Sequence, residues 1–195
     1  MAITSGIFSS DAAFDERLMD SLDQLRAKVQ HLKGIGLRIV LTSGSFDLVH
    51  LGHVKYLARA KEQGDVLVVG VYSDAKIRRR KGEDRPLVPE RERLEMLAHQ
   101  RPVDLLYLKE EGGERWDLIK AVEPDVLVLT ADHSYSDDDL EALKDLCGDI
   151  AVIERQADVT TSERIRQLYM HLGERLGPKL AEVLPGLIEN IIRRP

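Results

Sequence analysis

The chain has 195 residues, of which 43% are hydrophobic, and it contains a single cysteine. This length fits one globular domain, and the hydrophobic share is large enough for a sizeable core. A formal net charge of −6 and a pI near 5.6 argue against general binding to nucleic acid or to an anionic membrane. Because Cys147 has no thiol partner, an intrachain disulfide is excluded, and we expect a reducing compartment.

The first residues, MAITSGIFSSDAAF, contain no basic region followed by a long apolar stretch. Nowhere in the chain do about 18 apolar residues run together, as a membrane-spanning helix would require. We therefore expect a soluble, cytoplasmic protein that has neither a nucleic acid nor a membrane as its partner.

The expected secondary structure alternates between strands and helices. Residues 13–33 place apolar side chains three and four positions apart, which predicts an amphipathic helix that ends near Gly34 and Gly36. The predicted strands cover 37–44, 65–72, 103–108, 125–130 and 149–155, and the next helices 52–63, 89–99, 114–122, 137–147 and 161–176. Apolar strands separated by helices are typical of a parallel sheet that is covered on both faces. We predict an α/β fold with a doubly wound, five-stranded parallel sheet, whose ligands bind beyond the carboxyl ends of its strands.

Both ends of the chain extend beyond this predicted sheet. A last apolar helix is expected over 178–193, interrupted by Pro185 and Gly186. The expected organisation is an N-terminal extension with its helix, a central α/β domain and a C-terminal helical extension. Their boundaries are 1–36, 37–176 and 177–195. The terminal helices could cover the sheet or form a dimer contact, and the sequence leaves both open.

The turn after the first predicted strand, SGSFDLVHLGH, holds His50 and His53. Gly44 and Gly52 permit a close backbone approach, and the helix that follows offers unpaired N–H donors to an anion. Three interpretations compete for the two histidines. They could be zinc ligands, although this spacing lacks the further ligands that zinc needs; they could be packed and bonded to the loop backbone; or they could donate to the phosphates of a nucleotide.

A second candidate site is RQADVTTSERI, residues 155–165, which follows the last predicted strand. Thr160 and Glu163 fit a capping box, which by itself predicts only a well-formed helix start. Three hydroxyls at a helix N-terminus also suit phosphate oxygens, and an arginine adds a planar charged fork. These residues are Thr160, Thr161, Ser162 and Arg155.

A third candidate is SDAKIRRRKGEDRP, residues 73–86, which is expected to be a loop after the second strand. Such a basic run is most often a solvated charged surface. In a chain of net negative charge, however, a basic cluster at the ligand-binding edge is a candidate pyrophosphate clamp. Its members are Arg78, Arg79, Arg80, Lys81 and Arg85.

The ordered combination of GSFDLVHLGH, KGEDRP and RQADVTTSERI resembles the HxGH nucleotidylyltransferase superfamily over roughly residues 37 to 170. The most similar branch contains heptose-phosphate adenylyltransferase and glycerol-3-phosphate cytidylyltransferase. YSDAKIRRRKGEDRPLVPERERLEML resembles the heptose-phosphate adenylyltransferase pattern, whereas RQADVTTS resembles the cytidylyltransferase pattern RTxGISTT. The resemblance implies a Rossmann-like nucleotidylyltransferase domain over 37–176.

This resemblance also implies roles for individual residues. His50 and His53 would bind and polarise triphosphate oxygens, and Lys81 would stabilise the transferred phosphate. Asp47 is expected to be an orienting or substrate-side group, and Asp132 occupies the acidic position that relatives share near the substrate. The residues expected to bind the nucleotide are Ser45, Phe46, Gly52, Arg155, Thr160, Thr161 and Ser162.

The implied reaction transfers a nucleoside monophosphate, with AMP favoured, from a nucleoside triphosphate to a phosphorylated sugar or a related acceptor, and it releases pyrophosphate. Mg²⁺ would be the cofactor and would bridge the triphosphate, with no protein side chain assigned as its ligand. Transfer of CMP to a polyol or alcohol phosphate is the alternative. A catalytically silent, nucleotide-binding regulator is another alternative. Because relatives are often homodimers, this chain could also form a homodimer.

Two departures from the family pattern bear on the substrate. LTADHSY, residues 129–135, stands where relatives have KGGDY or MGDDW, and Asp158 replaces the glycine that usually precedes the hydroxyl run. The first segment is expected to shape the nucleotide or acceptor pocket. The identity of the substrate is therefore left more open than the type of reaction.

Overall fold

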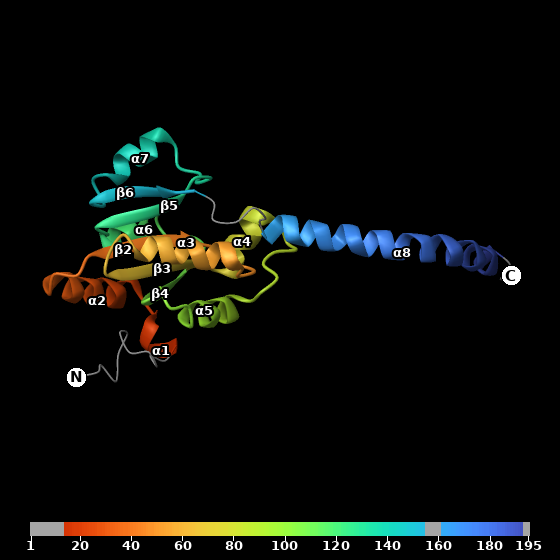
Figure 1. Ribbon diagram of the computed structural model, residues 1–195, viewed down its shortest axis with the longest axis horizontal. Coiled ribbons are helices and arrows are strands. Elements are labelled where there is room, and N and C mark those ends of the chain that lie inside the picture. Colours follow the sequence, from red (N-terminus) through yellow and green to blue (C-terminus); the bar gives the residue numbers. More distant parts are fainter. Residues whose placement is uncertain (1–13, 155–160, 193–195) are drawn as a thin grey trace. The chain divides into compact units, whose positions relative to one another are not determined.

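The structure is a computed structural model that describes residues 14–154 and 161–192, with side chains described over 165–184 of the second range (Figure 1). Its internal contacts divide the chain into two units, residues 1–157 and 158–195. The predicted domain boundary after residue 176 stays a prediction.

The first unit is built on a parallel sheet with six strands among the described residues. The strands are β1 (Leu18–Met19), β2 (Ile39–Gly44), β3 (Val66–Tyr72), β4 (Leu105–Lys109), β5 (Val126–Thr130) and β6 (Asp149–Ile153). The helices are α1 (Phe14–Arg17), α2 (Leu22–Gly34), α3 (Leu51–Lys61), α4 (Asp74–Lys81), α5 (Glu90–Ala98), α6 (Asp117–Val122) and α7 (Asp137–Leu143). The strand order is β1-β4-β3-β2-β5-β6, and every neighbouring pair is parallel.

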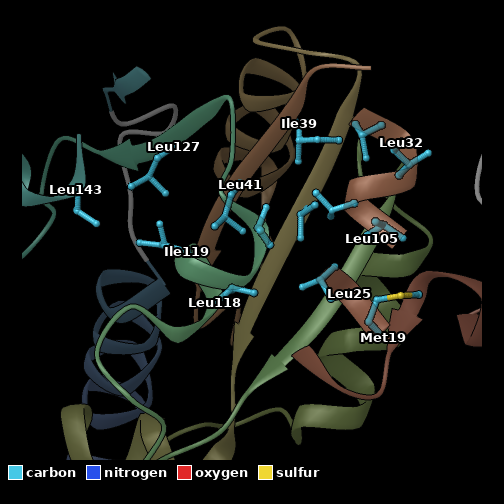
Figure 2. Close-up of a cluster of buried hydrophobic side chains, with 14 of the residues drawn as sticks. Met19, Leu25, Leu32, Ile39, Leu41, Leu105, Leu118, Ile119, Leu127 and Leu143 are labelled. Atoms are coloured by element: carbon cyan, nitrogen blue, oxygen red, sulfur yellow. The ribbon is translucent and has the colours of Figure 1, made fainter. Parts of the chain in front are cut away.

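Helices cover both faces of this sheet. Because successive residues of each strand point to opposite sides, each strand contributes side chains to two core clusters. Leu41 and Val68 belong to a core cluster that also takes apolar side chains from α2, α6 and α7; Figure 2 shows this first cluster. Val40 and Val69 belong to a second cluster, which includes side chains from α3 and α5. The predicted parallel, doubly wound α/β architecture is therefore confirmed.

The predicted number of five strands is wrong, because the N-terminal segment supplies a sixth. The helix expected over 13–33 is interrupted at Leu18 and Met19, which pair with Leu106 and Tyr107 of β4. Met19 is buried in the first core cluster. Ser21 then starts α2, because its side chain accepts a hydrogen bond from the N–H of Gln24. Pairing and burial outweigh the local helical pattern here.

The expected loop over residues 73–86 also needs correction, because its first half is α4. Ser73 is buried and caps this helix by accepting a hydrogen bond from the N–H of Lys76. The helix ends at Gly82, whose φ of 97° favours glycine. The basic residues of this segment therefore point in different directions around a helix.

The second unit contains α8 (Thr161–Ile192). Two helices were predicted here, over 161–176 and 178–193, but the structure has one, which runs through Pro178 and Pro185. A proline removes only one backbone donor, and it can kink a helix without ending it. Among the described residues, no helix combines the length and the apolar composition that crossing a membrane requires.

Candidate active site

The candidate site lies at the carboxyl edge of the sheet. β2 ends at Gly44, and the turn that follows leads into α3; β3 ends at Tyr72 and leads into α4. Because β2 and β3 are parallel neighbours with Gly44 paired to Val71, both connections leave from the same edge. This is where ligands bind in doubly wound folds.

A strained residue shapes the turn after β2. Phe46 has a φ of 48°, in the left-handed region that non-glycine residues seldom occupy. Its ring is buried against Gly44, where an added Cβ would lie 2.9 Å from the ring carbon Cε2. Its centroid also lies 5.5 Å from that of His53. Packing against the Phe46 ring thus favours glycine at position 44. The same ring helps to position His53, which is predicted to bind phosphate.

His50 and His53 cap the first turn of α3 for each other. Nδ1 of His50 accepts from the Gly52 N–H at 3.1 Å, and Nδ1 of His53 accepts from the His50 N–H at 3.3 Å. The two rings lie 4.1 Å apart. An Nδ1 atom that accepts must be unprotonated, so each neutral ring carries its proton on Nε2. The cap therefore selects the tautomer in which Nε2–H is the donor.

The electrostatic surroundings keep His53 neutral. Burial lowers its pKa to about 4, and the nearby His50 and Lys81 act in the same direction, while a backbone hydrogen bond with Leu48 opposes them. The His53 ring is therefore neutral at pH 7.

The capped histidines also bear on the zinc interpretation. With both Nδ1 atoms engaged by backbone N–H groups, the remaining nitrogen of each neutral ring carries a proton and cannot ligate a metal. In the described parts of the chain, no group of three or more histidine, cysteine or acidic residues is placed to hold a metal ion. The hydrogen bonds at Nδ1 therefore argue against zinc at this turn.

Asp47 anchors the segment after α4 to the histidine turn. Its side chain is buried, and Nε of Arg85 donates to its Oδ2 at 2.6 Å. The backbone N–H groups of Leu87 and Val88 donate to its Oδ1 at 2.7 and 2.9 Å. Both carboxylate oxygens are thus occupied by the protein itself. Of its two expected roles, orienting and substrate-side, the geometry favours the orienting one.

Lys81, the last residue of α4, interacts electrostatically with Arg85 and Asp47. Partial desolvation lowers its pKa first, and the positive charge of Arg85 adds to the effect, whereas Asp47 opposes it. Lys81 in turn lowers the pKa of His53. Lys81 is thus within electrostatic range of His53 and Asp47, and its predicted role at the transferred phosphate stays a prediction.

The rest of the predicted basic clamp is dispersed around α4. Arg78 is exposed, and Arg79 pairs with Glu111 at 3.0 Å. The guanidinium of Arg80 lies 5.2 Å from the centre of the Tyr72 ring. A helix turns successive side chains by about 100°, so these three arginines do not converge on one point.

Arg93 is a central residue that was not among the predicted site residues. It is fully buried, and its guanidinium donates to three groups: the Ser45 carbonyl at 2.6 Å, Asp74 at 2.7 Å and the Val88 carbonyl at 2.9 Å. It thereby joins the turn after β2, the start of α4 and the loop before α5. The available signal was its place in YSDAKIRRRKGEDRPLVPERERLEML, the stretch that resembles the heptose-phosphate adenylyltransferase pattern.

The variant segment after β5 is partly exposed. Asp132 is exposed, and the His133 N–H donates to the Thr130 carbonyl at 3.0 Å. Burial raises the pKa of Tyr135, and Tyr72 adds to this, while Arg80 opposes it. Tyr135 is partly buried and packs against the first core cluster.

Part of the second predicted motif falls outside the described residues. These positions are Arg155, Asp158 and Thr160. Thr161 and Ser162 begin α8, but their side chains are not described. Their predicted contacts with nucleotide phosphates stay predictions, as do those of Ser45, Phe46 and Gly52.

The chain matches curated relatives over part of their length. The bifunctional protein HldE of a Nitratiruptor species is 46% identical over 118 residues, which make up 60% of this chain and 25% of that protein. The bifunctional protein HldE of Campylobacter jejuni (serotype O:2) is 36% identical over 173 residues, or 85% of this chain and 37% of that protein. The chain thus spans much less than half of either relative.

Solved structures and a family model complete the comparison. The lipopolysaccharide core biosynthesis protein of Thermoplasma volcanium GSS1 is 30% identical with a TM-score of 0.56, over 63% of this chain and 100% of that one. The pantoate-beta-alanine ligase of Francisella tularensis is 15% identical with a TM-score of 0.52, over 73% of this chain and 68% of that one, which shows the fold alone. A family model described as cytidylyltransferase-like matches residues 41–175. Because this match covers more than half of the chain, the protein belongs to the cytidylyltransferase-like family of nucleotidylyltransferases.

Proposed function

We propose that this protein transfers a nucleoside monophosphate from a nucleoside triphosphate to the phosphate of a sugar phosphate and releases pyrophosphate. The observation that carries the proposal is the capped histidine pair beside Lys81, in which the tautomer and the neutral state of His53 suit donation to phosphate oxygens. AMP is the favoured group, because KGEDRP resembles the heptose-phosphate adenylyltransferase pattern and the HldE proteins are similar over this part of the chain.

The proposed chemistry needs no dedicated general base. A phosphate oxygen of the acceptor is already anionic at pH 7 and attacks the α-phosphorus directly. A new O–P bond forms, the bond between the α-phosphorus and the bridging oxygen breaks, and pyrophosphate leaves with the electron pair. His50 and His53 would donate from Nε2 to triphosphate oxygens, and Lys81 would offset negative charge at the transferred phosphate.

We expect Mg²⁺ to be held mainly by the substrate. No cluster of three or more carboxylate, histidine or cysteine ligands occurs among the residues that the structure describes. Mg²⁺ commonly takes only one or two carboxylates together with substrate phosphates and water, so it does not require such a cluster. When bound, it would neutralise part of the triphosphate charge.

Transfer of CMP to a polyol or alcohol phosphate is a second candidate function. It is favoured by RQADVTTS, which resembles the hydroxyl motif of the cytidylyltransferases. A third candidate is a regulator that binds nucleotide without turnover, which the variant segment LTADHSY leaves open.

One experiment separates these functions. Pyrophosphate release would be measured with each of four nucleoside triphosphates against a panel of sugar, polyol and alcohol phosphates. We expect the highest kcat/KM with ATP and a sugar phosphate. A preference for CTP and a polyol phosphate would select the second function, and tight nucleotide binding without release on any acceptor would select the regulator.

A further inference from the structure

The helical form of α4 gives it two differently placed cationic positions. Lys76 and Arg80 are four residues apart and therefore share one face, whereas Lys81 is rotated by about 100° from Arg80. Nζ of Lys76 lies 5.7 Å, and the guanidinium carbon of Arg80 5.2 Å, from the centre of the Tyr72 ring. Both cations are thus held at one aromatic ring at the end of β3.

Lys109 adds a third cation from the neighbouring strand. Tyr72 and Lys109 are register partners in β3 and β4, so their side chains leave the sheet on the same face. Tyr72 alternates with Val71 of the second core cluster, so it lies on the side of the first cluster. Lys109 is mostly shielded from solvent, at 15% side-chain exposure, and its Nζ lies 3.3 Å from Asp117. Nζ of Lys76 also donates to the Glu110 carbonyl at 3.3 Å.

Positive charge exceeds negative charge in this group. Asp117 pairs with Lys109, and Glu111 pairs with Arg79 on the adjacent side of the helix. In the described parts of the chain, neither Lys76 nor Arg80 forms an ion pair with a carboxylate. Desolvation lowers the pKa of Lys76 first, and the charge of Lys109 lowers it further. Lys76 is partly desolvated, Arg80 is exposed, and within the described residues neither has a carboxylate partner of its own, so the two cations are suited to a bound anion.

The surroundings of these cations suit a polar organic group as well. Gly70 and Ser43 are register partners on the same face as Tyr72, and a Cβ at position 70 would lie 2.6 Å from the Ser43 hydroxyl. Tyr135 packs against the first core cluster, on the side of the sheet where Tyr72 lies. Leu118 packs against Gly70, and serine and tyrosine hydroxyls are among the polar groups that orient ligands in mostly apolar sites.

We propose that Lys76, Arg80 and Lys109 bind the phosphate monoester of the acceptor sugar, next to the site where Lys81 meets the nucleotide. The proposal rests on the proposed nucleotidyl transfer and names a binding site for its second substrate. Transfer requires the acceptor oxygen to come within about 3.5 Å of the α-phosphorus, so two phosphate sites must adjoin. Arg80 and Lys81, which are consecutive at the end of α4, provide this adjacency.

Kinetics with the best acceptor from the pyrophosphate-release panel test the assignment. We expect Lys76→Met and Arg80→Met each to raise the KM for the acceptor by about tenfold or more, which corresponds to the loss of a charge-assisted hydrogen bond. The KM for the nucleotide should rise by less than about twofold. Arg78→Met is the matched control, since it removes the same charge from an exposed position of the same helix. Lys81→Met should show the opposite pattern and impair the nucleotide side.

Three outcomes would contradict the assignment. An acceptor KM in Lys76→Met and Arg80→Met equal to that of Arg78→Met would show that the cations do not bind the acceptor. A rise in the nucleotide KM alone would place them at the triphosphate instead. Binding of inorganic phosphate can be measured without turnover, from the backbone amide chemical shifts of α4. Undiminished phosphate binding in Lys76→Met would overturn the site. Absent turnover on every acceptor would overturn only the proposed function.

Discussion

His53 and His50 are joined by a hydrogen bond in which the backbone N–H of His50 donates to Nδ1 of His53 at 3.3 Å. The side chains predicted to bind phosphate are therefore also the side chains that start α3. The structural and the chemical interpretations of the two histidines are compatible, because the cap uses Nδ1 and leaves the proton on Nε2.

This double role predicts a variant that separates folding from catalysis. In His53→Gln, the amide oxygen can accept the bond from the His50 N–H, as glutamine does at this position of a capping box. The free energy of unfolding should therefore change by less than about 1 kcal/mol. Turnover should fall by at least about a hundredfold, because the imidazole donor is lost. Urea unfolding and pyrophosphate release measure the two effects, and near-normal turnover would contradict the role of His53.

The low pKa of His53 predicts a pH dependence of stability. Its pKa is about 4 in the folded chain, whereas the ordinary histidine value, expected in the unfolded chain, is 6.5, so folding favours the neutral ring. This contribution to stability is complete above pH 6.5 and is lost as the pH falls toward 4. Urea unfolding at pH 7 and pH 4.5 should show a larger loss in the wild type than in His53→Gln. Equal losses would mean that His53 does not titrate with a lowered pKa.

Asp47 is predicted to stabilise the loop after α4. Asp47→Ala leaves the largely buried Arg85 without its counter-ion and removes the acceptor of two backbone N–H groups. Removing one partner of a buried ion pair typically costs about 3–5 kcal/mol. Urea unfolding at pH 7 measures this loss, with the exposed Asp84→Ala as the control. If the two variants were equally stable, the anchoring role of Asp47 would be wrong.

Arg93 is predicted to require its guanidinium and not merely its charge. Lysine cannot donate from one planar fork to three groups, so Arg93→Lys should destabilise the protein by about 2 kcal/mol or more. Turnover should fall as well, because the turn at Ser45 and the start of α4 lose their common partner. Arg101→Lys, at an exposed position, is the control in both assays. Full stability and turnover in Arg93→Lys would refute this positioning role.

Periodicity and motif order were sufficient to predict much of the fold and part of the site. Apolar runs separated by amphipathic segments indicated a parallel α/β sheet, and the positions of His50 and Lys81 after successive strands placed both at its carboxyl edge. Such patterns are local, since each depends on a window of a few residues. They follow from the side-chain directions that strands and helices impose.

The tertiary structure decided the features that depend on distant partners. β1 exists because Leu18 and Met19 pair with β4, far along the chain, although their own surroundings favour a helix. Arg93 connects separate segments because folding brings Ser45 to it across 48 residues and Asp74 across 19. Lys76 and Arg80 share the Tyr72 ring only because their segment folds as a helix and not as a loop. Local sequence determines which way a side chain can point, but the groups that it meets there are set by pairing and burial between segments far apart in the chain.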